Sequence, residues 1–371
     1  MKIGIPKEVM VGEARIALTP DACKSLFISG HSIFLEKNAG HSSGYDDEDY
    51  RKVGVEVVDT AAQLFEVSQL IIKVKQPLAD DLALLRPHHL LFSYLHLAAD
   101  LSLVQALCDI GISAIPFESV LDELGGLPLL KPMSQIAGRI ATMRGASLLF
   151  RNRGGRGLLL GGVDGSESGR VVVLGAGIAG SQAVAVAMAL GAKVDVVDLD
   201  ENKLQLLTLK YPSVNVHLST PETVETLCIE ADLVIGAVLL AGRRAPVVLE
   251  QFVIKQMKEG SVIVDIAIDQ GGCIEGIRAT SSEQLSYVEN GVIHSAVPNM
   301  PATVARTASQ SLSSAILPYV EILAAAGVDG LLTAACSQSL ALQRAMAIKA
   351  GEVVDNILLD EIASKKAHTT V

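Results

Sequence analysis

The chain has 371 residues, half of them hydrophobic, and carries a formal net charge of −11. This length suits two domains rather than one. Aromatic residues make up only 4% and Trp is absent, which predicts an aliphatic core of the kind found around buried parallel strands. The acidic balance argues against nucleic acid and against membrane surfaces as partners, because both require basic patches. An anionic small molecule remains possible, since it needs only a local group of cations.

The five cysteines are scattered and odd in number, and none of them forms a CxxC pair. This pattern is typical of reduced thiols in a cytoplasmic protein. The histidines lack partners at metal-ligand spacing, so no metal site is expected. The first residues, MKIGIPKE, lack the apolar core of a secretion signal.

Strand and helix signals alternate along the first 110 residues, which predicts an α/β domain with a mostly parallel sheet. The apolar runs and turn residues predict strands at 2–5, 32–35, 70–74 and 90–94, and helices at 20–29, 61–67 and 101–108.

The middle of the chain repeats this alternation. It predicts a helix at 180–190 among strands at 170–174, 193–197, 232–238, 261–268 and 292–297. The uncharged stretch 171–192 is long enough to cross a membrane. Its four glycines, three of them in a phosphate-loop spacing, instead predict a buried strand, a turn and a buried helix.

The tail is predicted to be helical from about residue 307, with helical spacing of apolar residues across 340–362. We therefore expect an α/β fold of two Rossmann-like domains. The nucleotide-binding domain, 131–306, is inserted into a substrate domain made of residues 1–130 and the C-terminal helices, 307–371.

A glycine-rich turn follows the strand at 170–174 and opens the next helix. In such a turn the first glycine permits a tight bend, the second lets the backbone approach a pyrophosphate, and the third lets helix and strand pack closely. The helix then presents free N–H groups to the phosphates. The residues concerned are Gly175, Gly177, Ile178, Ala179 and Gly180.

Asp198 lies 18 positions after Gly180, where a carboxylate is expected to accept hydrogen bonds from the adenosine ribose. It would repel the extra phosphate of NADP, so NAD is the expected cofactor, although Lys203 is close enough to weaken this preference. The alternative is that the glycines only pack a helix on a sheet and that Asp198 caps a turn.

Polar side chains also end two other apolar runs. Asp269 ends the predicted strand 261–268, and ligands of open α/β sheets bind beyond the carboxyl ends of strands. A turn-forming aspartate before glycines is an equal alternative. His96 follows the run at 90–94, where a histidine is more often a core residue than a catalytic one.

Two further cationic positions stand out. Lys73 and Lys75 are two positions apart, so on a strand they would point to the same side, one solvated and the other in a site. Arg15 lies in an early loop, where the alternative is an ordinary surface charge.

Taken together, these segments resemble the alanine dehydrogenase family, which is related to the α subunit of NAD(P) transhydrogenase. The resemblance spans nearly the whole chain in the expected order. It rests on GIPKEVMVGEARIALTP (4–20), IIKVKQP (71–77), LLFSYLHLA (90–98), LPLLKPMSQIAGR (127–139), GGRGLLLGGV (154–163), VVVLGAGIAG (171–180), ADLVIGAVL (231–239), VDIAIDQGGCIEG (264–276) and NMPATVARTAS (299–309).

The resemblance implies roles for particular residues. Arg15 and Lys75 bind the pyruvate carboxylate and carbonyl, His96 is the general acid/base, and Asp269 assists proton movement at the carbon that bears the amine. Tyr94, Met133 and Asn299 complete the expected substrate site. Ser134 contacts the cofactor phosphates from a turn at 132–134, Asp198 holds the ribose, and Lys203, Leu239 and Met300 complete the expected cofactor site.

The implied activity is NAD-dependent oxidative deamination of L-alanine to pyruvate and ammonium, and the reverse reaction. The resemblance also implies a homohexamer with small molecules as its only other partners, and the cysteine pattern indicates the cytoplasm. Two alternatives remain open. One is a transhydrogenase α-like subunit, and the other is an amino-acid cyclodeaminase, a lyase that retains its nicotinamide through the cycle.

Overall fold

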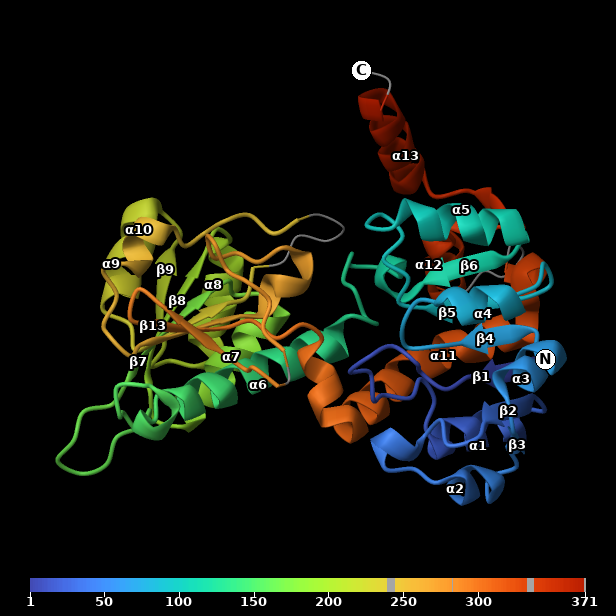
Figure 1. Ribbon diagram of the computed structural model, residues 1–371, viewed down its shortest axis with the longest axis horizontal. Coiled ribbons are helices and arrows are strands. Elements are labelled where there is room, and N and C mark those ends of the chain that lie inside the picture. The colour runs from blue at the N-terminus through green and yellow to red at the C-terminus, as the bar shows by residue number, and fades with distance from the viewer. Residues whose placement is uncertain (239–243, 282, 332–336, 370–371) are drawn as a thin grey trace. The chain divides into compact units, whose positions relative to one another are not determined.

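A computed structural model describes residues 1–238, 244–281, 283–331 and 337–369. The chain divides into two compact units (Figure 1). Unit 1 consists of residues 1–133 and 302–371, and unit 2 consists of residues 134–301.

The centre of unit 1 is an eight-stranded sheet. Six parallel strands lie in the order β3-β2-β1-β4-β5-β6, which is the 3-2-1-4-5-6 order of doubly wound nucleotide-binding folds. An antiparallel hairpin, β14-β15, extends the sheet beyond β6. The strands are β1 (Lys2–Ile5), β2 (Ser32–Glu36), β3 (Glu56–Val58), β4 (Leu70–Ile72), β5 (Leu90–Ser93), β6 (Ser113–Pro116), β14 (Ile348–Lys349) and β15 (Glu352–Val353).

Helices enclose the sheet of unit 1. Leu64 of α3 and Leu107 of α5 pack with Ile71 and Leu91 in one apolar cluster, while α1 packs against β2 and α11. The helices are α1 (Pro20–Ile28), α2 (Asp47–Arg51), α3 (Ala61–Val67), α4 (Ala79–Leu84), α5 (Leu101–Ile110), α11 (Ala305–Leu331), α12 (Ser337–Ala345) and α13 (Asn356–Thr369), with short 3₁₀ helices η1 (His41–Ser43) and η2 (Phe117–Ser119).

Unit 2 repeats the strand order around a seven-stranded sheet. Its six parallel strands run β9-β8-β7-β10-β11-β13, again 3-2-1-4-5-6 in chain order, and β12 pairs antiparallel with β13 at one edge. The strands are β7 (Arg170–Leu174), β8 (Lys193–Asp198), β9 (Asn215–Leu218), β10 (Leu233–Gly236), β11 (Val262–Asp265), β12 (Tyr287–Glu289) and β13 (Val292–Ser295).

Alternate residues of these strands enter two separate cores, as the two-residue period of a strand requires. Val171 and Val173 pack with α6, α7 and α8 on one face. Val172 and Leu174 pack with α9 and α10 on the other. The helices are α6 (Lys131–Leu148), α7 (Ile178–Ala189), α8 (Glu201–Lys210), α9 (Pro221–Ile229) and α10 (Gln251–Ile254), with 3₁₀ helices η3 (Arg151–Arg153), η4 (Ile266–Gln270) and η5 (Met300–Val304).

The expected fold class, α/β with two Rossmann-like sheets, is confirmed. The uncharged stretch 171–192 forms β7 and α7, as the glycine spacing predicted. In the part of the chain that the structure describes, no helix is both long enough and apolar enough to cross a membrane.

Two predicted elements are wrong. The stretch 340–362 is not one helix: α12 ends at Ala345, the hairpin β14-β15 follows, and α13 begins at Asn356. Gly351 has a φ of 83° and turns the hairpin, whose strands pair with each other and with β6. The strand predicted at 261–268 ends at Asp265, whose side chain accepts a hydrogen bond from the Ala267 N–H and so caps η4.

Candidate functional site

The glycine turn of unit 2 has the steric character of a nucleotide-binding loop. Gly175 adopts a φ of 108°, which disfavours any residue with a Cβ. A Cβ on Gly180 would lie 1.8 Å from the carbonyl oxygen of Gly175, so only glycine lets α7 approach β7 so closely. At Gly177 the situation is reversed, because a Cβ placed there meets no described atom within 4 Å beyond its chain neighbours.

This open space lies at the start of α7. Gly177 is the N-cap, and no side chain in the described part of the chain caps the helix there. The first N–H groups of α7 and the positive end of its dipole are therefore suited to a phosphate group. The loop therefore has the open space and the N–H groups that the pyrophosphate of a dinucleotide would need.

Asp198 ends β8, next to the loop. Its Oδ2 accepts the Ala176 N–H at 2.6 Å, and its Oδ1 accepts the Asp200 N–H at 2.8 Å. The carboxylate thus fixes the glycine loop, and each oxygen retains a lone pair for a ribose hydroxyl. The Lys203 ammonium lies 3.6 Å from an oxygen of Asp200, in the first turn of α8.

Two other residues assigned to the cofactor have structural settings that the sequence did not predict. Ser134 lies in the first turn of α6 rather than in a turn of its own, because that helix already begins at Lys131. Met300 is only 3% exposed and packs with the core cluster of α6, α7 and α8. Leu239 lies outside the described residues.

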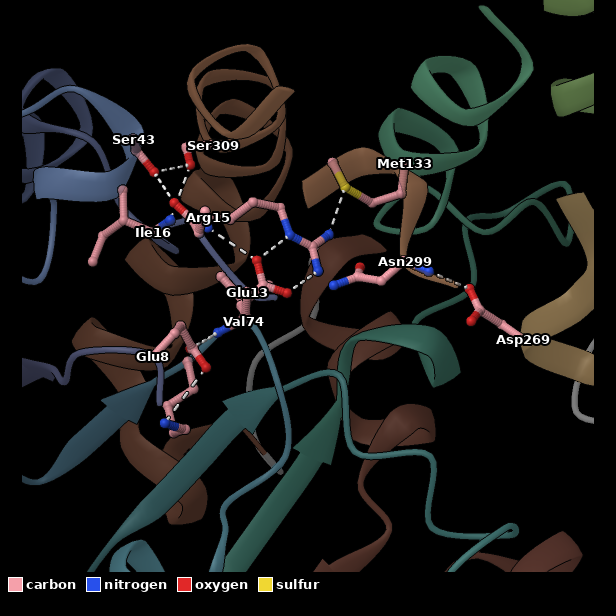
Figure 2. Close-up of polar contacts among 12 residues, drawn as sticks. Glu8, Glu13, Arg15, Ile16, Ser43, Val74, Met133, Asp269, Asn299 and Ser309 are labelled. Carbon is pink, nitrogen blue, oxygen red and sulfur yellow. Dashed lines mark hydrogen bonds and ion pairs between the residues drawn. The ribbon is translucent and has the colours of Figure 1, made fainter. Parts of the chain in front are cut away.

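Asp269 and Asn299 lie together in unit 2. The Asn299 N–H donates to Oδ2 of Asp269 at 3.2 Å (Figure 2). Asn299 has a φ of 54°, a left-handed conformation that asparagine tolerates better than most residues. Asp269 is in η4, four residues beyond the end of β11, and not on the strand itself.

Arg15, in unit 1, is buried rather than a surface charge, with its side chain 2% exposed. Its Nη1 lies 3.0 Å from the sulfur of Met133 (Figure 2). Burial lowers the pKa of the Arg15 guanidinium, but the hydrogen bonds and negative charge of Glu13 outweigh that effect and raise the pKa overall. Arg15 is therefore a permanent buried cation, the kind of group that binds a carboxylate.

Lys73 and Lys75 follow β4 and differ in their surroundings. Lys73 is 1% exposed and pairs with Glu8 at 3.6 Å and with Asp81 at 3.3 Å. The Val74 N–H donates to Glu8 at 2.6 Å. Lys75 is partly exposed. Lys73 is thus a structural cation, enclosed by two carboxylates.

His96 lies beyond the end of β5 with its ring half exposed, so the interpretation as a core histidine is wrong. Its backbone has a φ of 50°. The Glu118 carboxylate accepts the backbone N–H groups of Leu95 and His96, and lies 4.0 Å from the His96 Nδ1. The ring stacks on Tyr94, with 6.3 Å between centroids.

Tyr94 is a buried neighbour of the His96 ring. Its hydroxyl donates to the Leu129 carbonyl at 2.6 Å. Burial raises the pKa of the Tyr94 hydroxyl, while the nearby charge of Arg15 opposes that rise. The described part of unit 1 thus gathers a buried cation, an exposed imidazole and the apolar bodies of Tyr94 and Met133.

Two family models match almost the whole chain. The alanine dehydrogenase/PNT N-terminal domain matches residues 4–137, and the alanine dehydrogenase/PNT C-terminal domain matches residues 141–356. The chain belongs to the alanine dehydrogenase/PNT family. Alanine dehydrogenases of Staphylococcus epidermidis and Halomonas elongata are each 43% identical to it, over 329 and 328 residues and 88% of both chains.

Solved structures agree with this assignment. A structure named L-alanine dehydrogenase has a TM-score of 0.94 and 41% identity, covering 98% of this chain and 99% of that one. A transhydrogenase from Sinorhizobium meliloti has a TM-score of 0.82 at 24% identity, with 96% and 100% covered, and so shows the fold alone. The predicted family is confirmed, and its named relatives support an oxidoreductase that uses a nicotinamide cofactor.

Within this family fold, the sequence interpretation missed three acidic residues: Glu8, Glu13 and Glu118. Each is charged and lies in a segment with no helical or strand periodicity, which is typical of a solvated surface group. Glu13 stands two positions from Arg15, and that spacing is the one signal that was available.

Proposed function

We propose that the chain catalyses the NAD-dependent oxidative deamination of L-alanine to pyruvate and ammonium, and the reverse reductive amination. The observation that carries this proposal is the buried Arg15 cation beside two apolar side chains, Met133 and Tyr94, in a chain that also contains a dinucleotide-binding loop. The relatives named alanine dehydrogenase support it.

The substrate's carboxylate would be held by Arg15, whose guanidinium can bind it through two hydrogen bonds. Lys75 would polarise the carbonyl oxygen of pyruvate. The amine form of the substrate must lose a proton, and the water that is added later must also lose one. His96 would exchange these protons, because a neutral imidazole has one nitrogen that can accept a proton and one that can donate it.

The cofactor assignment rests on the fit of the loop. Gly175, Gly177 and Gly180, with the N-terminus of α7, would hold the pyrophosphate, and Asp198 would accept the ribose hydroxyls. The bound nicotinamide supplies the hydride acceptor for the substrate Cα–H. Asp269, fixed by the Asn299 N–H, would help move the proton at the amine-bearing carbon.

The preference for alanine follows from what lies near Arg15. Tyr94 and Met133 are 4% and 8% exposed, and both offer apolar surface suited to a methyl group. Glutamate would bring a second carboxylate into this apolar environment, which costs several kcal/mol without a partner. One additional methylene costs only ~1–3 kcal/mol, and an apolar pocket does not strongly reject an added hydroxyl, so 2-aminobutyrate and serine should react slowly.

The test is NADH formation by purified protein with NAD and a panel of L-amino acids. We expect L-alanine to react fastest and glutamate not at all. Faster reduction of NAD with glutamate, leucine or lysine would overturn the assignment. Hydride exchange between two nicotinamides without an amino acid would favour a transhydrogenase-like subunit. Ammonia release with retained cofactor and no net NADH would favour a cyclodeaminase.

We infer a homohexamer and a cytoplasmic location from the family resemblance and from the reduced-thiol pattern of the cysteines. Six copies of a 39.0 kDa chain give about 234 kDa. Light scattering during size-exclusion chromatography should return that mass, whereas a dimer near 78 kDa would contradict the hexamer.

A further inference from the structure

Glu13 is a fully buried carboxylate for which the proposed reaction has no use. Its side chain is 0% exposed and lies against Arg15, whose side chain is 2% exposed. Oε1 of Glu13 accepts the Arg15 Nε–H at 2.7 Å, and Oε2 accepts from Nη2 at 2.6 Å. Burying an ionised carboxylate is expensive unless it is paired in this way, so its presence calls for a role.

The geometry of the pair determines which part of the guanidinium can meet a ligand. Glu13 occupies the edge formed by Nε and one proton of Nη2, which is one of the two edges that can bind a carboxylate bidentately. The other edge is formed by Nη1 and Nη2, and Nη1 also lies 3.0 Å from the sulfur of Met133 (Figure 2). A thioether is a weak acceptor, so a substrate carboxylate at this edge would be much preferred to it.

The backbone around Arg15 is also fixed. Residues 6–19, all of which the structure describes, form neither helix nor strand. The Arg15 N–H donates to Glu13 at 2.9 Å. On either side of Arg15, Ser43 donates to the Ala14 carbonyl at 2.7 Å, and the Ile16 N–H donates to the Ser309 hydroxyl at 2.9 Å.

The two serines also bond to each other, with 2.9 Å between their hydroxyl oxygens (Figure 2). The peptide groups flanking Arg15 are thereby tied to η1 and α11. A loop residue held at its backbone from both sides, and at its side chain by a buried carboxylate, is preorganised for binding. Among these anchors, only Glu13 acts directly on the guanidinium.

We propose that Glu13 is a positioning residue for substrate recognition. Its carboxylate holds the Arg15 guanidinium so that the Nη1–Nη2 edge, and not the Nε edge, receives the substrate's carboxylate. The direction of that edge then sets where the Cα of the bound substrate lies. This proposal rests on the proposed function, since it takes Arg15 to be the carboxylate-binding residue.

The test compares Glu13→Gln and Glu13→Asp with wild type. Glutamine has the same size but one acceptor oxygen and no charge, so it cannot bind both guanidinium nitrogens. We expect the KM for pyruvate and the Kd of pyruvate for the enzyme–NADH complex to rise about 10- to 100-fold, the range of one charge-assisted hydrogen bond. Aspartate, which keeps the charge on a shorter side chain, should recover part of this loss. The Kd for NADH should stay within about threefold.

Glu36→Gln is the matched control. The Glu36 carboxylate accepts the Lys7 N–H at 2.8 Å, near the start of the same segment, and in the described structure its hydrogen bond is to Lys7 and not to Arg15. If Glu36→Gln raised the KM for pyruvate as much as Glu13→Gln does, Glu13 would act only through loop stability, and the proposal would fail. It would also fail if Glu13→Gln bound pyruvate as tightly as wild type.

Direct binding separates this proposal from the proposed function. Wild type that neither binds pyruvate in the presence of NADH nor turns it over would contradict the proposed function. A different result would contradict the positioning role alone. In that case wild type binds pyruvate, and Glu13→Gln lowers kcat but leaves the KM and Kd for pyruvate unchanged.

Discussion

The half-exposed ring of His96 depends on a strained backbone. A positive φ at a non-glycine residue strains the backbone by roughly 1–3 kcal/mol, and this conformation persists only when the surrounding structure holds it. Glu118 enforces it here by accepting the N–H groups of residues 95 and 96 on one carboxylate. The conformation turns the ring out from the end of β5, and Tyr94 stacks on one face of it. The strain is what makes an imidazole accessible at this position.

His96→Ala tests the proposed role of His96 as the main proton-transfer group. General acid/base groups typically contribute ~10²–10⁴-fold in rate, so turnover of alanine should fall by about that factor. NADH affinity should be nearly unchanged, because the cofactor loop belongs to unit 2. Steady-state kinetics and NADH fluorescence titration check both parts. A drop of less than tenfold would assign His96 a structural role.

Asp198→Ala should weaken NAD binding and reduce the preference for NAD over NADP. The variant loses the hydrogen bond from the Ala176 N–H, and with it the proposed ribose acceptor and the proposed repulsion of a 2′-phosphate. We expect kcat/KM with NAD to fall about 10- to 100-fold. Glu201→Gln, in the neighbouring helix, is the control for a general change in charge. Equal efficiency of the wild type with NAD and NADP would refute the preference itself.

The sequence could identify candidate residues but not their burial. Lys73 and Lys75 are both lysines that follow the same strand, and the sequence does not distinguish them. In the structure, however, Lys73 is buried between Glu8 and Asp81. The sequence around Arg15 does not indicate that the Glu13 carboxylate is buried beside the guanidinium. A charged side chain is buried only where the fold brings partners to it, and those partners cannot be predicted from the neighbouring sequence.

At the scale of elements, the glycine loop offers a paired test. Gly177→Ala adds a Cβ where no described atom beyond the chain neighbours lies within 4 Å, and its φ of −67° suits alanine. The fold should therefore be retained, while NAD affinity should fall at least tenfold because the Cβ occupies the approach of the pyrophosphate.

Gly180→Ala should behave in the opposite way. Its Cβ would lie 1.8 Å from the Gly175 carbonyl oxygen, which forces α7 away from β7. Such overpacking typically costs ~1–3 kcal/mol of stability. Thermal unfolding and NAD titration of the two variants separate these effects. If Gly177→Ala lost stability while keeping NAD affinity, the loop would serve packing alone.

His89 joins α3 to β5 and makes stability depend on pH. Its Nδ1 accepts the Arg86 N–H at 2.9 Å, and its Nε2 lies 2.9 Å from the Phe65 carbonyl oxygen. Burial lowers the pKa of His89 from its ordinary value of 6.5. Between the lowered pKa and 6.5 the unfolded chain binds the extra proton, so stability is lost as the pH falls through that window.

The check is urea unfolding of wild type and His89→Gln from about pH 7.5 to about pH 5. The stability advantage of wild type should shrink as the pH falls, with a slope of at most about 1.4 kcal/mol per pH unit. His88→Gln, at the exposed neighbouring histidine, should keep most of the pH dependence of wild type, because burial lowers the pKa of His89 more than the charge of His88 does. A wild-type advantage that grows toward acid pH would mean that the folded state favours the charged ring.

Elements with strong apolar periodicity were predicted well, and others were missed for physical reasons. β1, β7 and α3 match their predicted bounds. Helix α6 was not predicted from the sequence, because Gly138 and Gly145 lie inside it and glycine lowers helix propensity. The fold requires both: a Cβ on Gly138 would lie 2.0 Å from the Ala179 carbonyl oxygen, and one on Gly145 would lie 2.4 Å from Leu233.

At the scale of the molecule, the chain builds the same strand order twice. In unit 1, residues distant in sequence complete the structure, because Ser309 and Ser313 of α11 accept hydrogen bonds from the backbone of Ile16 and Thr19. Unit 2 is continuous in sequence. Local patterns along the chain can therefore predict the sheet of unit 2, but not the contacts through which α11 fixes the loop that carries Arg15.

We propose that residues 131–306 form a cofactor-binding domain that folds on its own. The two apolar clusters on either face of its sheet are composed entirely of residues between 141 and 300. Every described strand pairing of this sheet also lies within that range. A core that needs no residue from elsewhere satisfies the physical requirement for an independent domain.

The expressed fragment 131–306 should therefore be monodisperse, unfold cooperatively and bind NADH with an affinity near that of the full chain. Circular dichroism and NADH fluorescence measure these properties, and Asp198→Ala in the fragment is the control for specific binding. A fragment that is unfolded would contradict the domain assignment. A folded fragment that binds NADH no better than its Asp198→Ala variant would show that the glycine loop and Asp198 alone do not form the cofactor site.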